Sequence, residues 1–214
     1  MAKEGKKSRD SRLTSEHGGS CATSSQDFMY LVSWLFQLSA NWAEQHGGGN
    51  SSLYTPAAIP MLFSAFRCLL IELNSKILQG HNPEVLKQLS KSPNDVEVFA
   101  ERYGPDPELL ADLELLHEIR NEIVHPATLP EGTAHNTPVY LIDIRQRGLL
   151  QSTEKEDSDY IWSDQIRSHR LLIWACDVIA RSAIHAIQSH NLHEMVAQGY
   201  MASYEGYVSD RTVE

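Results

Sequence analysis

Four long stretches of this sequence repeat large apolar residues every three or four positions, and this spacing limits what the chain can fold into. The clearest repeat lies between Pro107 and His125, where the apolar residues are Leu109, Leu113, Leu116, Ile119 and Ile123. An α-helix has about 3.6 residues per turn, so such a repeat forms one apolar stripe that packs against a core. The same reasoning predicts three more long helices, at residues 26–46, 56–78 and 160–190.

Prolines and capping residues mark the expected ends of several helices. Asp106 followed by Pro107 is typical of a helix N-cap with proline at the first helical position. Pro126 disfavours the helical conformation at His125, so the third long helix should end there. Two short helices are expected between the second and third long ones, because "NPEVLKQL" and "SPNDVEVFA" each begin with a capping residue and a proline.

The sequence changes character between the third and fourth long helices. "PATLPEGTAHNTP" is typical of a loop, "VYLIDIRQRGLL" has the composition of a short β-hairpin or extended segment, and "QSTEKEDSD" resembles an acidic linker. The sequence therefore predicts an all-α fold, an antiparallel bundle of four to five helices with a loop or short β-hairpin inserted between the third and fourth long helices.

The two ends of the chain lack the strong periodicity of its middle. Residues 1–25 are rich in Lys, Ser and Gly, which predicts a disordered basic tail. We expect the helical domain to span residues 26–200 and a C-terminal tail to span residues 201–214. The pattern in "LHEMVAQGYMASYEGYV" leaves open whether this last amphipathic piece docks on the bundle or frays.

Charge restricts the classes of partner that the domain can bind. The net charge is −10, and residues 1–12 carry five basic against two acidic residues, which leaves about −13 for the rest. Non-specific nucleic-acid binding depends on neutralising phosphates with basic side chains, so the acidic charge counts against a general nucleic-acid coat protein. Any RNA binding has to use local positive charge or a basic partner.

The cysteines and the hydropathy pattern indicate a cytoplasmic protein. Cys21, Cys68 and Cys176 have no metal-ligand spacing, and three cysteines cannot all pair with one another. The basic N-terminus is not followed by the apolar region of a signal peptide. The most apolar run, "LLIWACDVIARSAIHAI", is interrupted by Asp177 and Arg181, so we expect no membrane span.

A polar group at the end of the third long helix is the main candidate site. In "LHEIRNEIVHP", Asn121 and His125 share one helix face and Arg120 lies about 100° to the side. The spacing of Arg and His alone is weak evidence, because Arg12 and His17 repeat it. Two interpretations are open. The group is either a cationic helix C-terminus, or a site in which arginine binds phosphate and histidine transfers protons.

This stretch resembles the R-x4–6-H motif of the HEPN superfamily, in the form in which a polar residue, often Asn, follows the Arg. The resemblance implies a helical bundle that commonly dimerises and sets two motifs across a shared cleft. It further implies a metal-independent endoribonuclease, often a toxin or an antiviral or stress effector. His125 would act as general base or acid for attack of the RNA 2′-hydroxyl, Arg120 would stabilise the phosphorane, and Asn121 would orient the site. One branch carries a tyrosine, modified by an inhibitor, where this chain has Ala127.

The resemblance also sets the expected partners. We expect an RNA substrate, a homodimer and an inhibitory partner protein, with no cofactor, no metal and no membrane. Three further arginines are candidate substrate-binding residues, against the alternative that they are only solvated surface: Arg145, Arg147 and Arg170. Because some family members lack catalysis, a module that binds a partner protein or nucleotide is the second hypothesis. A structural bundle in which the motif merely caps a helix is the third.

Overall fold

The computed structural model describes residues 24–46, 50–75, 82–91, 94–125, 139–151 and 165–208, and all regular structure in these ranges is helical. The long helices are α1 (Ser25–His46), α2 (Thr55–Leu73), α5 (Pro107–Val124) and α8 (His169–Gln188). The short ones are α3 (Pro83–Lys91), α4 (Asp95–Tyr103), α6 (Val139–Gln146), α9 (Glu194–Met201) and the 3₁₀ turn η3 (Glu205–Tyr207). The all-α prediction is confirmed.

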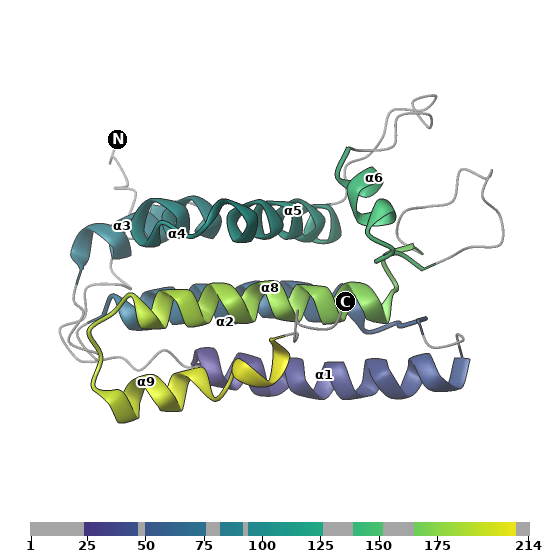
Figure 1. The fold of residues 1–214 in the computed structure, drawn as a ribbon, viewed down its shortest axis with the longest axis horizontal. Coiled ribbons are helices and arrows are strands. Elements are labelled where there is room, and N and C mark those ends of the chain that lie inside the picture. The colour runs from purple at the N-terminus through teal and green to yellow at the C-terminus, as the bar shows by residue number, and fades with distance from the viewer. Residues whose placement is uncertain are drawn as a thin grey trace, which may run out of the picture.

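The helices form three layers (Figure 1). Helices α2 and α8 pack against each other in the middle layer and run in the same direction. Helix α5 covers one side of this pair together with α4, and α1 covers the other side together with α9. Both α1 and α5 run opposite to the middle pair. The end of α5 that carries the candidate motif therefore lies in a different layer from α1.

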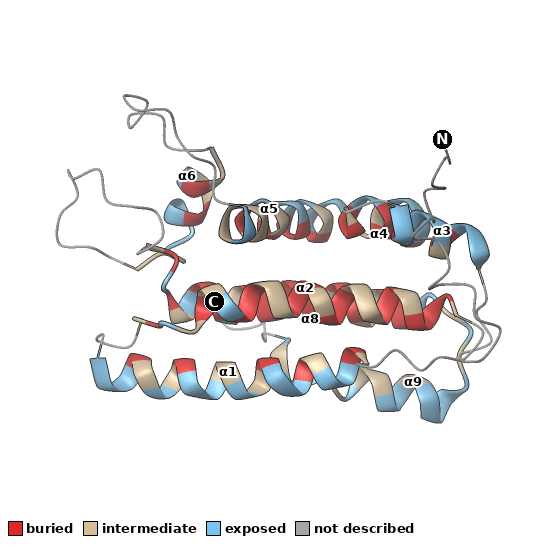
Figure 2. Ribbon diagram, turned by 180° about the vertical axis from the view of Figure 1, so that it is seen from behind, coloured by how far each residue is buried: buried red, intermediate tan, exposed pale blue. Residues whose placement is uncertain are grey.

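The middle helices are apolar on nearly every face, which explains why they are the most buried (Figure 2). The predicted core face of α2 is fully enclosed, at Leu62, Phe66, Leu69, Leu70 and Leu73. By length and hydropathy, α2 and α8 resemble membrane-crossing helices, with mean hydropathies of 1.5 and 1.3. However, 56% and 67% of the residues in their apolar windows are buried inside the fold. Burial in the bundle accounts for this composition.

Local capping sets where the long helices begin. Asp106 caps α5 by accepting a hydrogen bond from Leu109 N at 2.9 Å, so the predicted start is confirmed. Ser168 caps α8 by accepting from Leu171 N at 3.2 Å. The predicted start of the fourth long helix near residue 160 is too early, because residues 166 and 167 are not helical and Ser168 is the cap. The remainder of the predicted extension, residues 160–164, lies outside the described ranges.

The segment that we expected to form a β-hairpin is helix α6. Its buried apolar residues, Leu141 and Ile144, are three positions apart, as the inward face of a helix requires. Short runs rich in Ile, Val and Tyr do not distinguish strand from helix, and here packing against α5 decides. Gly148, at φ 67°, follows the helix in a left-handed conformation that glycine adopts at little cost.

The described chain stays packed past residue 201, where we expected a C-terminal tail to begin. The Tyr204 ring is fully buried, and Tyr207 packs edge-on against Phe36 with ring centroids 5.6 Å apart. Gln26 Nε2 donates a hydrogen bond to Gly199 O at 3.2 Å, which joins α1 to α9. The packed chain therefore continues to Tyr207. Of the predicted tails at residues 1–25 and 201–214, residues 1–23 and 209–214 lie outside the described ranges.

Candidate functional site

The motif residues lie at the C-terminal end of α5, as the sequence predicts. Arg120 Nη1 donates a hydrogen bond to Asn121 Oδ1 at 2.9 Å, and both side chains are half-buried. His125 is the C-cap residue, and its backbone N–H donates to Asn121 O at 2.7 Å. Its imidazole is exposed and makes no hydrogen bond or ion pair with the described residues. The structure thus joins Arg120 to Asn121 directly and leaves the His125 ring open to solvent.

Arg120 contributes to the electrostatics of two neighbouring groups. Burial lowers the pKa of His117, and the Arg120 cation lowers it further. The ring of His117 also contacts the Phe63 ring, with centroids 5.7 Å apart. Burial raises the pKa of Asp95 to about 6, although Arg67 and Arg120 oppose the rise. Arg120 is therefore near a neutral histidine and a buried carboxyl group, and no carboxylate within the described chain forms an ion pair with it.

Tyr140 on α6 is a neighbour of the motif that sequence analysis missed. Burial raises its pKa, and the carboxylates of Glu122 and Glu118 on α5 raise it further. Tyr140 therefore keeps its proton and presents a hydroxyl beside the last turns of α5. Its position depends on how α6 packs, and α6 follows a segment outside the described residues. No spacing in the sequence relates Tyr140 to Arg120.

The three candidate substrate-binding arginines have different environments. Arg145 is exposed and donates to Gln165 Oε1 at 3.1 Å. Arg170 is exposed, and its backbone N–H donates to Asn50 Oδ1 at 3.0 Å. Within the described ranges, neither side chain forms a hydrogen bond with Arg120. Arg145 and Arg170 thus remain candidates on the strength of exposure alone.

Arg147, the third candidate substrate-binding residue, also has structural contacts. Its guanidinium donates to the buried carboxylate of Asp112 at 2.6 Å and pairs with Asp143 at 3.1 Å. It also lies over the Trp174 ring, 5.8 Å from the centroid. These contacts tie the end of α6 to α5 and α8. Two carboxylates already neutralise Arg147, so it is a poor binding group for phosphate.

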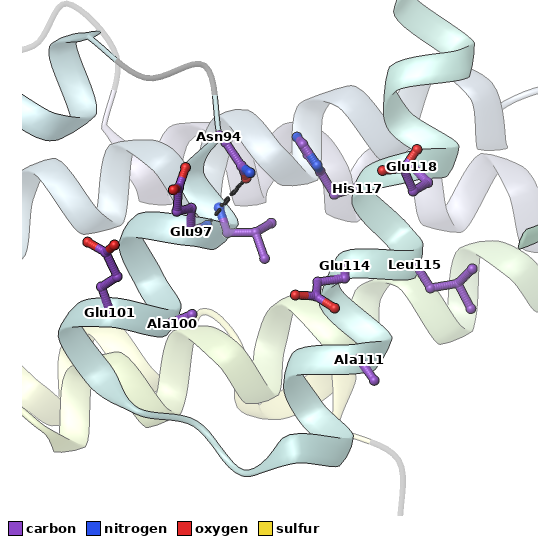
Figure 3. A pocket seen from close by; sticks show the side chains of 10 residues that line it. Asn94, Glu97, Ala100, Glu101, Ala111, Glu114, Leu115, His117 and Glu118 are labelled. Atoms are coloured by element: carbon purple, nitrogen blue, oxygen red, sulfur yellow. Dashed lines mark hydrogen bonds between the residues drawn. The ribbon is translucent and has the colours of Figure 1, made fainter.

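An open hollow of about 620 Å³ lies between α4 and α5 (Figure 3). Its α4 wall carries Glu97 and Glu101, and its α5 wall carries Glu114, His117 and Glu118. Four carboxylates in one hollow repel a phosphate backbone. This hollow is therefore a poor site for RNA or any other polyanion.

The histidines of the C-terminal half do not form a metal site in the described chain. His185 Nε2 lies 3.0 Å from Tyr103 O, and His190 Nδ1 lies 3.2 Å from Ala186 O. One nitrogen of each ring is therefore hydrogen-bonded to a backbone carbonyl group. Among the described residues, no three or more His, Cys, Asp and Glu side chains gather in a way that could hold a metal ion.

Comparisons with known protein families, with curated proteins and with solved structures found no match to this chain. Its candidate function therefore rests on its own residues and on the resemblance of the motif.

We expect the free energy of unfolding to fall as the pH falls from about 7 to about 5. Burial lowers the pKa of His117, His169 and His190 below the usual histidine value of 6.5. Below about pH 6.5 these three histidines therefore bind more protons in the unfolded chain than in the folded one, and this difference favours unfolding. Urea unfolding curves recorded across this range measure the slope.

Asp95 contributes to the pH dependence of stability with the opposite sign, and its substitution gives a control for that dependence. Its pKa is about 6 in the fold against 3.8 in a model peptide, so the folded state binds the proton first as the pH falls through this window. That uptake stabilises the fold on acidification. The Asp95→Asn variant lacks the uptake, so its stability should fall more steeply than that of wild type between about pH 6 and 4. Parallel curves for the two proteins would contradict the raised pKa.

Proposed function

We propose that this protein is a metal-independent endoribonuclease of the HEPN type, with a HEPN-like bundle and a site at the end of α5. The observation that carries this proposal is the pairing of Arg120 with Asn121 one turn before the exposed ring of His125. The amide oxygen of Asn121 occupies one N–H of the guanidinium and fixes its orientation. A guanidinium has five such donors, so others are left for a phosphate.

The chemistry assigns one role to each residue. His125 removes the proton from a ribose 2′-hydroxyl as the 2′-oxygen forms a bond to the adjacent phosphorus. Arg120 stabilises the charge that develops on the phosphorane, and Asn121 keeps Arg120 in place. The bond from phosphorus to the 5′-oxygen then breaks, and an acid protonates that oxygen. The products are a 2′,3′-cyclic phosphate and a free 5′-hydroxyl.

A second copy of the chain would supply the acid. The general base must start neutral and the general acid must start protonated, and one imidazole cannot be in both states. The base and the acid are therefore best provided by two His125 side chains. We therefore propose a homodimer that brings two α5 ends together. The exposed Arg145 and Arg170 are the candidate RNA-binding residues. We place the enzyme in the cytoplasm, as a toxin or a defence or stress effector controlled by an inhibitory protein.

Incubating purified protein with mixed RNAs in EDTA tests this function. Wild type should cleave and leave cyclic-phosphate ends, whereas His125→Ala and Arg120→Ala should each be slower by at least about 100-fold. His46→Ala is the matched control, because His46 is also an exposed histidine at a helix C-terminus. Equal cleavage by all four proteins would show that the activity does not come from this site.

The second candidate function is a non-catalytic HEPN-like module that binds a partner protein or a nucleotide. The carboxylates of Glu118 and Glu122 beside the motif, and the acidic hollow between α4 and α5, are the observations in favour of a basic partner protein. Folded wild-type protein that cleaves none of the RNAs would support it. A motif that serves only to end α5 would leave both cleavage and partner binding unchanged in His125→Ala.

A further inference from the structure

The outward face of α1 is apolar although it faces solvent. Four large side chains along it are exposed, namely Tyr30 at 68%, Leu31 at 43%, Trp34 at 62% and Leu38 at 37%. They recur at helical spacing, so they form one stripe on the side of α1 away from α2. Exposed α1 residues are visible along this outer edge in Figure 2. We call these four residues the α1 stripe.

The α1 stripe lies on a length of helix without charge. No Asp, Glu, Lys or Arg occurs between Asp27 and Glu44, although the whole chain has a net charge of −10. Solvent-facing helix surfaces are normally polar or charged, and contiguous exposed apolar patches on soluble proteins commonly mark interaction sites. The α1 stripe therefore marks an interaction surface.

We infer that the α1 stripe binds the same stripe of a second copy of this chain. Two acidic chains repel each other, so they approach most closely where neither carries charge. An uncharged face also offers nothing that attracts RNA, an anionic lipid surface or a charged protein, whereas it complements a face like itself. The preceding 23 residues, with Met1 and Leu13 as their only large apolar side chains, are poorly suited to cover it.

Antiparallel pairing of two α1 helices matches the stripe to itself. A two-fold axis at Trp34 sets Trp34 against its copy and Tyr30 against Leu38 of the other chain, because the residue numbers of each pair then sum to 68. The acidic residues Asp27 and Glu44 lie at the two ends of the contact, where their mutual repulsion is screened by salt. Higher salt should therefore strengthen the association.

The exposed area suits a weak homodimer. A tyrosine and a tryptophan can each bury 150–250 Å². Scaled by the exposed fractions of its four side chains, the α1 stripe offers an area on the order of 400 Å² per copy. Standard interfaces bury roughly 800 Å² per partner. We expect dissociation constants in the micromolar range.

Pairing through α1 is distinct from the dimer of the proposed function. Helix α1 and the motif-bearing helix α5 are on opposite sides of the α2 and α8 layer (Figure 1). An α1 dimer thus leaves His125 of each copy free and does not create a composite site. If both contacts form, the chain assembles through two separate two-fold interfaces, which gives a closed tetramer or a longer oligomer.

Sedimentation velocity on the full chain, from about 1 to 100 μM, tests this inference. Trp34→Glu should weaken self-association by at least about 30-fold, since a charge replaces the tryptophan that the contact between the two copies would bury. Circular dichroism and the urea midpoint verify that this exposed substitution leaves the fold intact. The matched control is Ile142→Glu, which replaces an apolar residue of α6 that is 44% exposed and should leave the α1 contact unchanged.

Two results would overturn the inference. One is wild-type protein that stays monomeric up to the highest concentration. The other is association that survives Trp34→Glu but is lost in Ile142→Glu, because it would place the contact at the end of α5 and α6. That second outcome would still support the dimer of the proposed endoribonuclease. The two proposals can therefore fail separately.

Discussion

The Tyr204→Ala variant should unfold with a free energy about 3 to 5 kcal/mol below that of wild type. The ring is fully buried, and it lies close to the start of α1 and the end of α2, near Ser25 and Glu72. Removing it leaves a cavity where three parts of the chain meet. A loss of this size is a large share of the stability of an ordinary domain. Urea unfolding followed by circular dichroism measures it.

The Tyr204→Phe variant separates the packing of the ring from the contribution of its hydroxyl. The hydroxyl is buried without a hydrogen-bond partner among the described residues, so its removal should change stability by less than about 1 kcal/mol. If Tyr204→Ala costs no more than Tyr204→Phe, residues 201–208 are not part of the cooperative fold. Protease resistance of the C-terminal segment gives an independent measurement of the same question.

The Asp112→Ala variant should lose about 3 kcal/mol of stability, because Asp112 is the shared acceptor of two arginines. Its carboxylate is 5% exposed and accepts from Arg147 at 2.6 Å and from Arg181 at 3.0 Å. Arg181 retains its pair with Asp177 at 3.0 Å. Arg147, whose side chain is 37% exposed, is partly solvated, which keeps the loss at the lower end of the range for broken buried pairs.

Asp143→Ala is the matched control for Asp112→Ala. Asp143 pairs with the same guanidinium at 3.1 Å, but its side chain is 46% exposed. Such an i,i+4 pair contributes only about 0.3–0.5 kcal/mol. Hydrogen exchange in α6 should also rise in Asp112→Ala, because Arg147 no longer fixes the end of that helix to α5. Similar losses in the two variants would show that the buried network does not hold α6.

The long helices could be predicted because their signals are local. The apolar stripe of α5 and the cap at Asp106 are both contained in a few turns of sequence, and the structure reproduces them. Helix α1 likewise begins at Ser25, one residue before the predicted start. In each case one face packs on the core, so helical periodicity is sufficient evidence.

The features that the sequence pattern did not reveal depend on distant residues. The role of Arg147 follows from Asp112, which is 35 positions away, and nothing near Arg147 reveals it. The composition of α6 fits either a strand or a helix until Leu141 and Ile144 have a surface to pack on. Likewise, Tyr204 lies in a weakly periodic segment and is buried only because α1 and α2 meet there.

The candidate site was predictable only where its contacts are local in the sequence. Arg120 and Asn121 are neighbours in the sequence, so their contact at 2.9 Å is local. The solvent exposure of His125 follows from the helix end that Pro126 indicates. The proximity of Tyr140 to Glu122 depends on tertiary packing, and it therefore lies beyond what spacing can reveal.

The described chain returns near its end to the helix with which it begins, because Tyr204 lies near Ser25 and the Tyr207 ring packs on Phe36. A domain of this kind can be spliced into a loop of another protein with little distortion of the host, because its first and last described elements pack together. The same geometry allows circular permutation, in which a short linker joins the old ends and a new break opens elsewhere. The order of the helices along the chain is thus less constrained than their packing.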